Sequence, residues 1–378
     1  MNPFPKSIAV AGAWGYIGRK FLEASLAEGI TAYVYDPGEP PADLDLSAAT
    51  RIRDAEEFYQ LPAELFHLAL HPEHRRQGTE TLLERGRTEP ILILNEKPMA
   101  LPEQPGECQR LIDATRDSGA VMLYDFPELY DSMTRRVVGW LQCFDETRIT
   151  KMTVTRSKDR EGRENPRNRK RMVPIQFQES VHCTAFVLYL LGKIRGSVEA
   201  AVNEGITVDA KSEAYDPPNP EAYPHVVDGR CRYELMIGET QVTGVTDFKA
   251  NAPWSKRRVV EGVADGKPFT IDVDYLEGKK RLIINGEDQG CDPAADSYSQ
   301  AISTSVRWFR EIDKAELTHG VHPNPEFARL TYQLSGALWR SSQERGSVRL
   351  ASMAELLGFD SGFAEARANL PRYPSASD

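Results

Sequence analysis

The sequence predicts an α/β domain with a doubly wound parallel sheet, followed by an α+β domain with a large, open, mainly antiparallel sheet. Up to about Tyr124, short apolar runs alternate with longer amphipathic ones, a pattern typical of parallel strands joined by crossover helices. Beyond Tyr124, closely spaced strands separated by turns predominate. A chain of 378 residues is also too long for one ordinary core. We therefore expect two domains, at residues 1–124 and 125–378.

The first domain begins with an expected strand that runs directly into a glycine-rich turn. Its expected strands are residues 7–12, 31–36, 64–70, 91–95 and 120–125. Its expected helices are residues 16–29, 73–86 and 106–119. Each helix stands between two apolar runs, so each is expected to cross over to the next parallel strand.

The second domain is expected to carry a sheet with helices on one face. Its expected strands are residues 150–157, 197–210, 230–238, 240–250, 256–263, 269–275 and 280–286. Its expected helices are residues 180–192, 297–312 and 325–346. Because most of these strands follow one another through short turns, antiparallel pairing is expected.

Composition restricts the classes of function. Hydrophobic residues make up 40% and charged residues 27%, as in a globular protein. The net charge of −10 gives no general attraction to nucleic acid. No apolar run is long enough to span a membrane, and the N-terminus lacks a signal-peptide pattern. The five scattered cysteines show no metal-binding spacing, so we expect reduced thiols, no metal and a cytoplasmic location.

The turn after the first strand has the composition of a dinucleotide-binding loop. The segment GAWGYIGR places a glycine-rich turn between a strand and a helix, with alanine at one usual glycine position. Such a turn lets the backbone approach a pyrophosphate at the helix N-terminus. The residues expected to contact the cofactor here are Gly12, Ala13, Trp14, Gly15, Tyr16, Ile17 and Gly18.

Asp36, at the end of the second strand, suggests which cofactor is bound. An acidic residue at this distance from the glycine turn accepts hydrogen bonds from the adenosine ribose hydroxyls and repels a 2′-phosphate. No arginine follows it directly. NAD is therefore expected in preference to NADP.

Lys97 lies in the segment ILILNEKPMA, directly after an apolar run that predicts a buried strand. Ligands of parallel sheets bind beyond the carboxyl ends of the strands, so Glu96 and Lys97 are expected on the cofactor side. Pro98 restricts the backbone of Lys97, which is therefore held in place. A lysine beside a cationic nicotinamide is a suitable base for a hydroxyl proton.

Taken together, the glycine turn, NEKPMA and SVHCTAFVLYLLG resemble the Gfo/Idh/MocA oxidoreductases over nearly the whole chain. The resemblance implies an N-terminal Rossmann domain, NAD(P), and a sugar, cyclitol or derivative as substrate. It implies a homodimer or homotetramer joined through the C-terminal sheet. Lys97 matches the catalytic lysine and His182 the active-site histidine. His71, Pro72 and His74 match residues that touch the cofactor.

Three positions depart from the pattern of this family. Gln178 and Ala185 stand where many members have aspartates near the histidine, and Leu129 stands where an arginine is frequent. Glutamine orients a hydroxyl but cannot accept its proton. Glu128, Glu179 and Tyr130 are therefore further candidates for acid, base or substrate contacts.

A basic stretch at residues 156–171 has two interpretations. It can be a solvated loop, or its arginines can bind an anionic group of the substrate. The candidates for the second role are Arg163, Arg167 and Arg169.

Three functions remain open. The first is an NAD-dependent oxidoreductase acting on a CH–OH group of a sugar-like, possibly acidic, small molecule. The second is a lyase or hydrolase that oxidises its substrate only transiently, a role favoured by the missing aspartates. The third is an NAD- or sugar-sensing binding protein, which has no need of a positioned Lys97.

Overall fold

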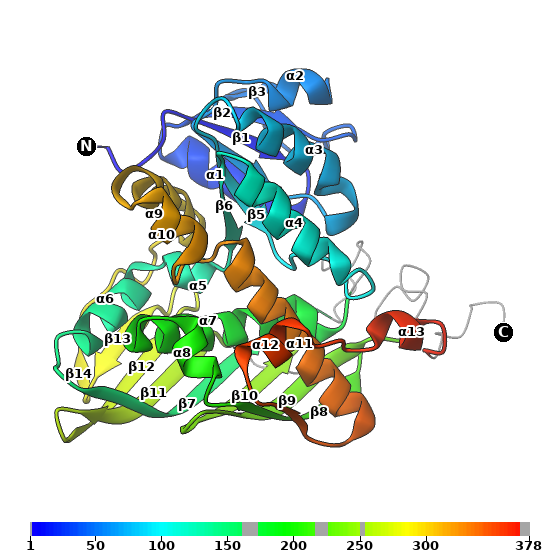
Figure 1. Cartoon of the computed structure of the whole chain (residues 1–378). Helices are drawn as coiled ribbons and strands as arrows, with labels where there is room; N and C mark the ends of the chain where they lie inside the picture. The colour runs from blue at the N-terminus through cyan, green and yellow to red at the C-terminus, as the bar shows by residue number, and fades with distance from the viewer. Residues whose placement is uncertain (1, 161–172, 216–225, 250–253, 371–378) are drawn as a thin grey trace. The chain divides into compact units, whose positions relative to one another are not determined.

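The structure is a computed structural model that describes residues 2–160, 173–215, 226–249 and 254–370. Two compact units are present (Figure 1). The first contains residues 1–101, 106–131 and 296–329, and the second contains residues 102–105, 132–295 and 330–378. The first unit therefore includes residues 296–329, which the contiguous boundary at residue 124 had assigned to the second domain.

In the described part of the first unit, six parallel strands form sheet A in the order β3-β2-β1-β4-β5-β6. They are β1 (Ser7–Ala11), β2 (Thr31–Tyr35), β3 (Ala49–Arg51), β4 (Leu65–Leu68), β5 (Leu92–Glu96) and β6 (Val121–Asp125). This order, which reverses direction at β1, is that of a doubly wound dinucleotide-binding domain. The predicted fold class of the first domain is confirmed.

The helices of the first unit lie on both sides of sheet A. Figure 1 shows α1 (Tyr16–Ala27) on one side and α3 (Pro72–Arg85) with α4 (Gly106–Asp117) on the other. The remaining helices are α2 (Ala55–Tyr59), α5 (Pro127–Tyr130), α9 (Ser297–Glu311) and α10 (Lys314–His319). Helix α9 joins this unit because it packs against α1 and α5. The ring centroid of Trp308 on α9 lies 5.0 Å from that of Tyr130 on α5.

In the described part of the second unit, nine strands form sheet B in the order β14-β13-β12-β11-β7-β10-β9-β8-β15. The pair β7–β10 is parallel and the other neighbours are antiparallel, as expected of a mainly antiparallel sheet. The strands are β7 (Thr147–Ser157), β8 (Ile206–Ala214), β9 (Asp228–Ile237), β10 (Thr240–Asp247), β11 (Arg257–Ala264), β12 (Lys267–Asp274), β13 (Arg281–Ile284), β14 (Glu287–Asp288) and β15 (Val348–Leu350).

Helices cover one face of sheet B, and Figure 1 shows α7, α8 and α11 along that face. The helical segments are α6 (Ser132–Leu141), the π-helical turn η2 (Gln176–Ser180), α7 (Val181–Arg195), α8 (Val198–Val202), α11 (Pro325–Glu344), α12 (Met353–Leu357) and α13 (Phe363–Arg367). The single strand expected at 197–210 is wrong in its first part. Ser197 caps α8 by accepting from the Ala200 N–H, and β8 starts only after Gly205, which has a positive φ.

None of the helices in the described ranges is both long and apolar enough to cross a bilayer. The five cysteines all fall within those ranges, and no disulfide joins any of them.

Candidate active site

The turn after β1 depends on two glycines that a larger residue could not replace. Gly12 has a φ of +77°, and a Cβ atom there would lie 2.8 Å from the Ala69 carbonyl oxygen. A Cβ atom on Gly18 would lie 2.2 Å from the Gly12 carbonyl oxygen. The Gly12 N–H also donates to the Tyr35 carbonyl at 2.8 Å. The turn is thereby held against the carboxyl ends of β2 and β4.

The N-terminus of α1 is suited to a phosphate group. Gly15 precedes the helix, and none of the described side chains caps it. The N–H groups of a first helical turn lack intrahelical acceptors and present the positive end of the helix dipole. The cradle at Gly12 and Gly18, together with these donors, fits the pyrophosphate of a dinucleotide. By contrast, no group of three or more metal-binding side chains occurs among the described residues.

Asp36 follows β2 and is fixed by the glycine turn. Its carboxylate accepts from the Trp14 backbone N–H at 3.2 Å and from the Gly38 N–H at 3.0 Å. The Trp14 indole N–H donates to the Gly38 carbonyl at 2.8 Å, which closes the loop. A carboxylate has about four lone-pair positions, so this one retains capacity for ribose hydroxyls.

Arg51 is a neighbour of this loop that sequence reasoning missed. Its guanidinium carbon lies 5.8 Å from the centroid of the Trp14 ring, and its Nη1 lies 3.0 Å from Glu39. The arginine is 15 residues beyond Asp36 in the chain, but β3 pairs with β2 and so places Arg51 next to the end of β2. Only the strand pairing, and no local motif, could have revealed it.

The other predicted cofactor residues lie near the ends of β1 and β4. His71 precedes α3, Pro72 is its first residue, and His74 is exposed. The His71 Nδ1 atom lies 3.7 Å from a Glu73 carboxylate oxygen. Tyr16 and Ile17 form the half-buried start of α1, whereas Ala13 is buried.

Lys97 is placed by a fully buried strand, as its sequence context predicts. Every residue of β5 is buried, ending with Glu96, and Lys97 follows as a half-buried side chain. The peptide bond between Lys97 and Pro98 is cis. The lysine thus lies at the carboxyl edge of sheet A, on the same edge as the glycine turn and Asp36.

Three buried carboxyl groups gather beside Lys97. Glu96 pairs in register with Asp125 at the ends of β5 and β6, and Glu128 comes from α5. Burial raises the pKa of Asp125 well above its usual range, and the neighbouring Glu96 and Glu128 raise it further against the opposing effect of Lys97. Asp125 therefore retains a proton at pH values where an exposed aspartate would have lost it.

His67 is a buried polar residue that sequence reasoning did not select. Its Nδ1 atom lies 3.2 Å from the Leu94 carbonyl, which only accepts, so Nδ1 carries the proton. Its Nε2 atom lies 3.7 Å from a Glu96 oxygen. Burial lowers the pKa of His67 to about 3, so the ring is neutral. The sequence does carry one signal for His67: it is the polar residue in the apolar run 65–68, which is predicted to be a buried strand.

Tyr130, a predicted substrate contact, is buried inside the first unit. Its hydroxyl donates to the Tyr124 carbonyl at 2.8 Å, and its own carbonyl accepts from Thr304 at 3.0 Å. These bonds connect the end of β6 to α9. The structure thereby gives Tyr130 a structural role, and Leu129 beside it is also buried.

In the second unit, Gln178, Glu179 and His182 lie on one continuous helical run. Gln178 and Glu179 belong to the π-helical turn η2, and His182 is in the first turn of α7. His182 is buried, as are all residues of α7 from Val181 to Gly192, including Ala185. Single π-helical turns occur frequently at functional sites, and hydrophobic periodicity does not distinguish them from α-helix.

Glu179 is held between two cations. One carboxylate oxygen lies 2.5 Å from Arg156 Nε and the other 2.6 Å from Lys158 Nζ. Arg156 is the next-to-last residue of β7 and Lys158 follows the strand directly, and Glu179 and Arg156 are buried. The three predicted anion-binding residues, Arg163, Arg167 and Arg169, lie outside the described residues.

Comparisons with known proteins identify the fold. No protein-family description matches the sequence, and no curated protein matches it. A probable dehydrogenase from Thermotoga maritima aligns with a TM-score of 0.66 at 14% identity, covering 91% of this chain and 98% of that one. A myo-inositol dehydrogenase from Corynebacterium glutamicum gives a TM-score of 0.63 at 15% identity, with 91% and 98% covered.

A protein of a different functional class shares the same fold. The transcriptional regulator Gal80p from Kluyveromyces lactis aligns with a TM-score of 0.61 at 11% identity, covering 93% of this chain and 95% of that one. At these identities the comparisons establish the two-domain architecture. A shared fold does not fix the function, which depends on the residues of the site.

Proposed function

We propose that this protein is an NAD-dependent oxidoreductase that acts on a CH–OH group of a sugar, a cyclitol or an acidic derivative of one. The observation that carries the proposal is the carboxyl edge of sheet A. There a glycine cradle, Asp36 and a lysine fixed by a buried strand follow three strands of one parallel sheet. The dehydrogenases with the same fold support the class of reaction.

The residues of the cradle would hold the cofactor, which supplies a hydride acceptor when bound. Gly12 and Gly18 keep the turn open for the pyrophosphate, and the N-terminus of α1 offers its N–H groups. Asp36 would accept hydrogen bonds from the ribose hydroxyls, which favours NAD over NADP.

Lys97 is proposed as the acid/base group for the substrate hydroxyl, assisted by His182. A lysine Nζ atom accepts the hydroxyl proton only in its neutral form. Gln178 is proposed to orient the substrate without taking its proton. Asp125, whose pKa is raised, adds a proton-carrying carboxyl group on the Lys97 side.

A combined measurement tests the proposal. The protein would be titrated with NAD and with NADP by calorimetry and then incubated with NAD and a panel of neutral and acidic sugars and cyclitols. The absorbance of reduced nicotinamide and the product masses would be recorded together. We expect tighter binding of NAD, a product two hydrogens lighter than its substrate, and about a 10²- to 10⁴-fold slower turnover for Lys97→Met. Full turnover by Lys97→Met would overturn the assignment of Lys97.

The second candidate is a lyase or hydrolase that returns the hydride to its substrate. The buried carboxyl group of Asp125 favours it, because such a reaction needs an acid beyond the one that a simple oxidation uses. A product formed without accumulation of reduced nicotinamide would support this candidate. A binding protein, the third possibility, would bind NAD and a sugar without forming any product.

We also propose that the chain self-associates through the face of sheet B opposite α7 and α11. Alternate residues of β9 point to that face and are exposed, among them Arg232, Glu234 and Met236, which is 41% exposed. Open sheet faces with exposed apolar side chains tend to pair. Light scattering is expected to give a dimer or tetramer mass, and Met236→Lys is expected to lower it. A monomer mass for the unmodified chain would contradict the proposal.

A further inference from the structure

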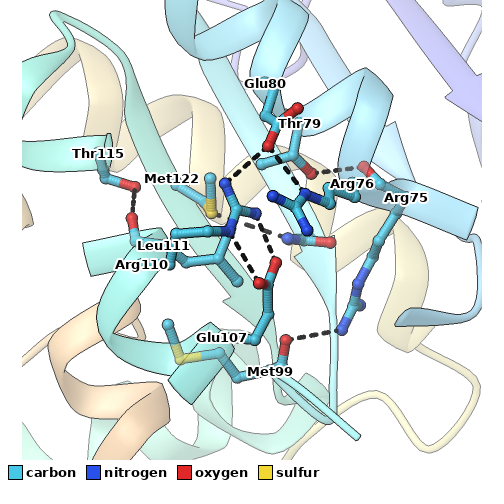
Figure 2. A network of polar contacts seen from close by, with 11 residues as sticks. Arg75, Arg76, Thr79, Glu80, Met99, Glu107, Arg110, Leu111, Thr115 and Met122 are labelled. Atoms are coloured by element: carbon cyan, nitrogen blue, oxygen red, sulfur yellow. Dashed lines mark hydrogen bonds and ion pairs between the residues drawn. The ribbon is translucent and has the colours of Figure 1, made fainter. Parts of the chain in front are cut away.

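Arg75 is a buried cation whose hydrogen bonds go to the backbone around Lys97. The residue lies on α3 and is 3% exposed. Its guanidinium donates to the carbonyl oxygens of Glu96 and Pro98, and to that of Met99 at 3.2 Å. Figure 2 shows the side chain reaching from α3 toward Met99. Buried guanidinium groups are commonly paired with carboxylates, so a bond pattern built from three carbonyls requires an explanation.

The three carbonyls stand on both sides of Lys97. The Glu96 carbonyl precedes it, and the Pro98 and Met99 carbonyls follow it. A guanidinium is rigid and planar and presents five N–H donors, so one arginine can hold peptide groups before and after the same residue. A lysine in its place has a single nitrogen and cannot span them in the same way.

The neighbouring residue shows that this arrangement is specific to Arg75. Arg76 lies on the outward face of α3, where its Nε atom donates to Glu80 at 3.0 Å and both side chains are largely exposed. The two arginines are adjacent in sequence and share a helix (Figure 2). Only Arg75 is turned toward the segment that carries Lys97.

We propose that Arg75 is a positioning residue for Lys97: it fixes the backbone on both sides of the lysine and thereby sets where the lysine Nζ atom lies. The inference rests on the proposed function, in which Lys97 is the acid/base group. Arg75 touches backbone and does not act on the substrate itself. Its effect should therefore appear in the placement and reactivity of Lys97, whereas cofactor binding should be unaffected.

The test compares Arg75→Met and Arg75→Lys with the matched control Arg76→Met, all in the full chain. Lys97 would be acetylated with trace acetic anhydride over a range of pH, and the modification rate of its peptide measured by mass spectrometry. NAD binding would be measured by calorimetry, folding by circular dichroism, and turnover with any substrate found in the panel. A side chain that only supported the fold would leave the Lys97 labelling profile unchanged in a folded variant.

We expect Arg75→Met to alter the Lys97 labelling rate severalfold and to lower kcat by about 10²-fold, since misplacing a reacting group by about 1 Å has effects of that size. The NAD affinity should change little. Arg75→Lys should show smaller changes in the same direction, and Arg76→Met should match the unmodified protein.

The outcomes separate this inference from the proposed function. Normal labelling and turnover in folded Arg75→Met would overturn the role of Arg75. If that variant does not fold, the same result in Arg75→Lys would overturn it. If Lys97→Met retains turnover, the acid/base assignment fails, while the labelling rates still decide whether Arg75 places the lysine.

Discussion

Two buried carboxyl groups lie close to the proposed catalytic residues, and their surroundings are opposite. Asp125, at the edge of sheet A, is beside Glu96 and Glu128. Glu179, one turn before His182, is between Arg156 and Lys158. Like charges favour the protonated form of a carboxyl group, whereas cations favour its ionised form. The two units therefore offer different chemistry from the same functional group.

The difference comes from how each carboxyl group is placed. Asp125 and Glu96 are brought together by the register of two parallel strands, and both are polar residues at the end of buried runs. Glu179 is brought to its cations by a π-helical turn that faces the end of β7. A carboxyl group that is kept protonated can carry a proton, whereas one that is held ionised by cations acts as a fixed charge. Asp125 is thus the better proton carrier, and Glu179 the better fixed anion.

The largest effect is expected from Glu179→Gln. The substitution removes the negative charge and leaves Arg156 and Lys158 close together without their shared carboxylate. Breaking a buried pair by removing one partner typically costs about 3–5 kcal/mol of unfolding free energy. Denaturant unfolding at neutral pH would measure the loss.

The control for Glu179→Gln is an exposed ion pair on sheet B, which joins β7 to β11. Lys151 and Glu261 lie 3.2 Å apart, and their side chains are 50% and 41% exposed. Glu261→Gln should cost at most about 1 kcal/mol, as is usual for surface pairs. Equal losses in the two variants would show that Glu179 is not held as a buried anion, and the comparison with Asp125 would fail.

Most of the architecture could be predicted from the sequence because it follows from hydrophobic patterning. The apolar runs that become β1, β2, β4, β5 and β6 are uninterrupted and separated by helical patterns, which leaves a parallel sheet as the simple solution. Helix α9 was assigned to the wrong side of the boundary. Its amphipathic pattern shows that one face is buried, but not that α1 and α5 bury it.

The parts of the candidate site that lie within one local motif could be predicted from the sequence. The contacts between residues far apart in the sequence could not. The glycine turn and Lys97 lie within short segments that carry their own signals. Arg75 was passed over because the basic pair at residues 75–76 is ambiguous in sequence, and only α3 packing distinguishes the two. The cations of Glu179 lie at and just beyond the end of β7, far from Glu179 in sequence, so no local motif includes all three residues.

A second prediction concerns His67, whose Nε2 atom faces Glu96 on the Asp125 side of the comparison. Burial lowers the pKa of His67 from 6.5 to about 3. Below pH 6.5 the unfolded chain binds a proton there and the folded chain does not, so stability should fall as the pH drops and should be constant above 6.5. Each pH unit corresponds to about 1.4 kcal/mol.

His67→Gln should remove this acid dependence, because an amide can donate to the Leu94 carbonyl but does not titrate. Unfolding free energies would be measured at pH 7 and at about pH 5 for both proteins. Between these pH values the unmodified protein should lose about 2 kcal/mol more stability than His67→Gln. A variant that destabilises with acid as steeply as the unmodified protein would show that His67 is already charged in the fold.

The smallest effect, of opposite sign, is expected from Asp125→Asn. Because the pKa of Asp125 is raised above 3.8, its contribution to stability is fully present below that value and is lost as the pH rises toward the folded-state pKa. Asparagine has the same shape and no charge to desolvate. It also loses the attraction to Lys97, which offsets part of the benefit.

We expect Asp125→Asn to gain at most about 2 kcal/mol of unfolding free energy near pH 7 and nothing below pH 3.8. Thermal unfolding at both pH values would measure it. A loss of stability confined to neutral pH would mean that the ionised form of Asp125 is favoured, as it is for Glu179, and that the two sites do not differ in kind.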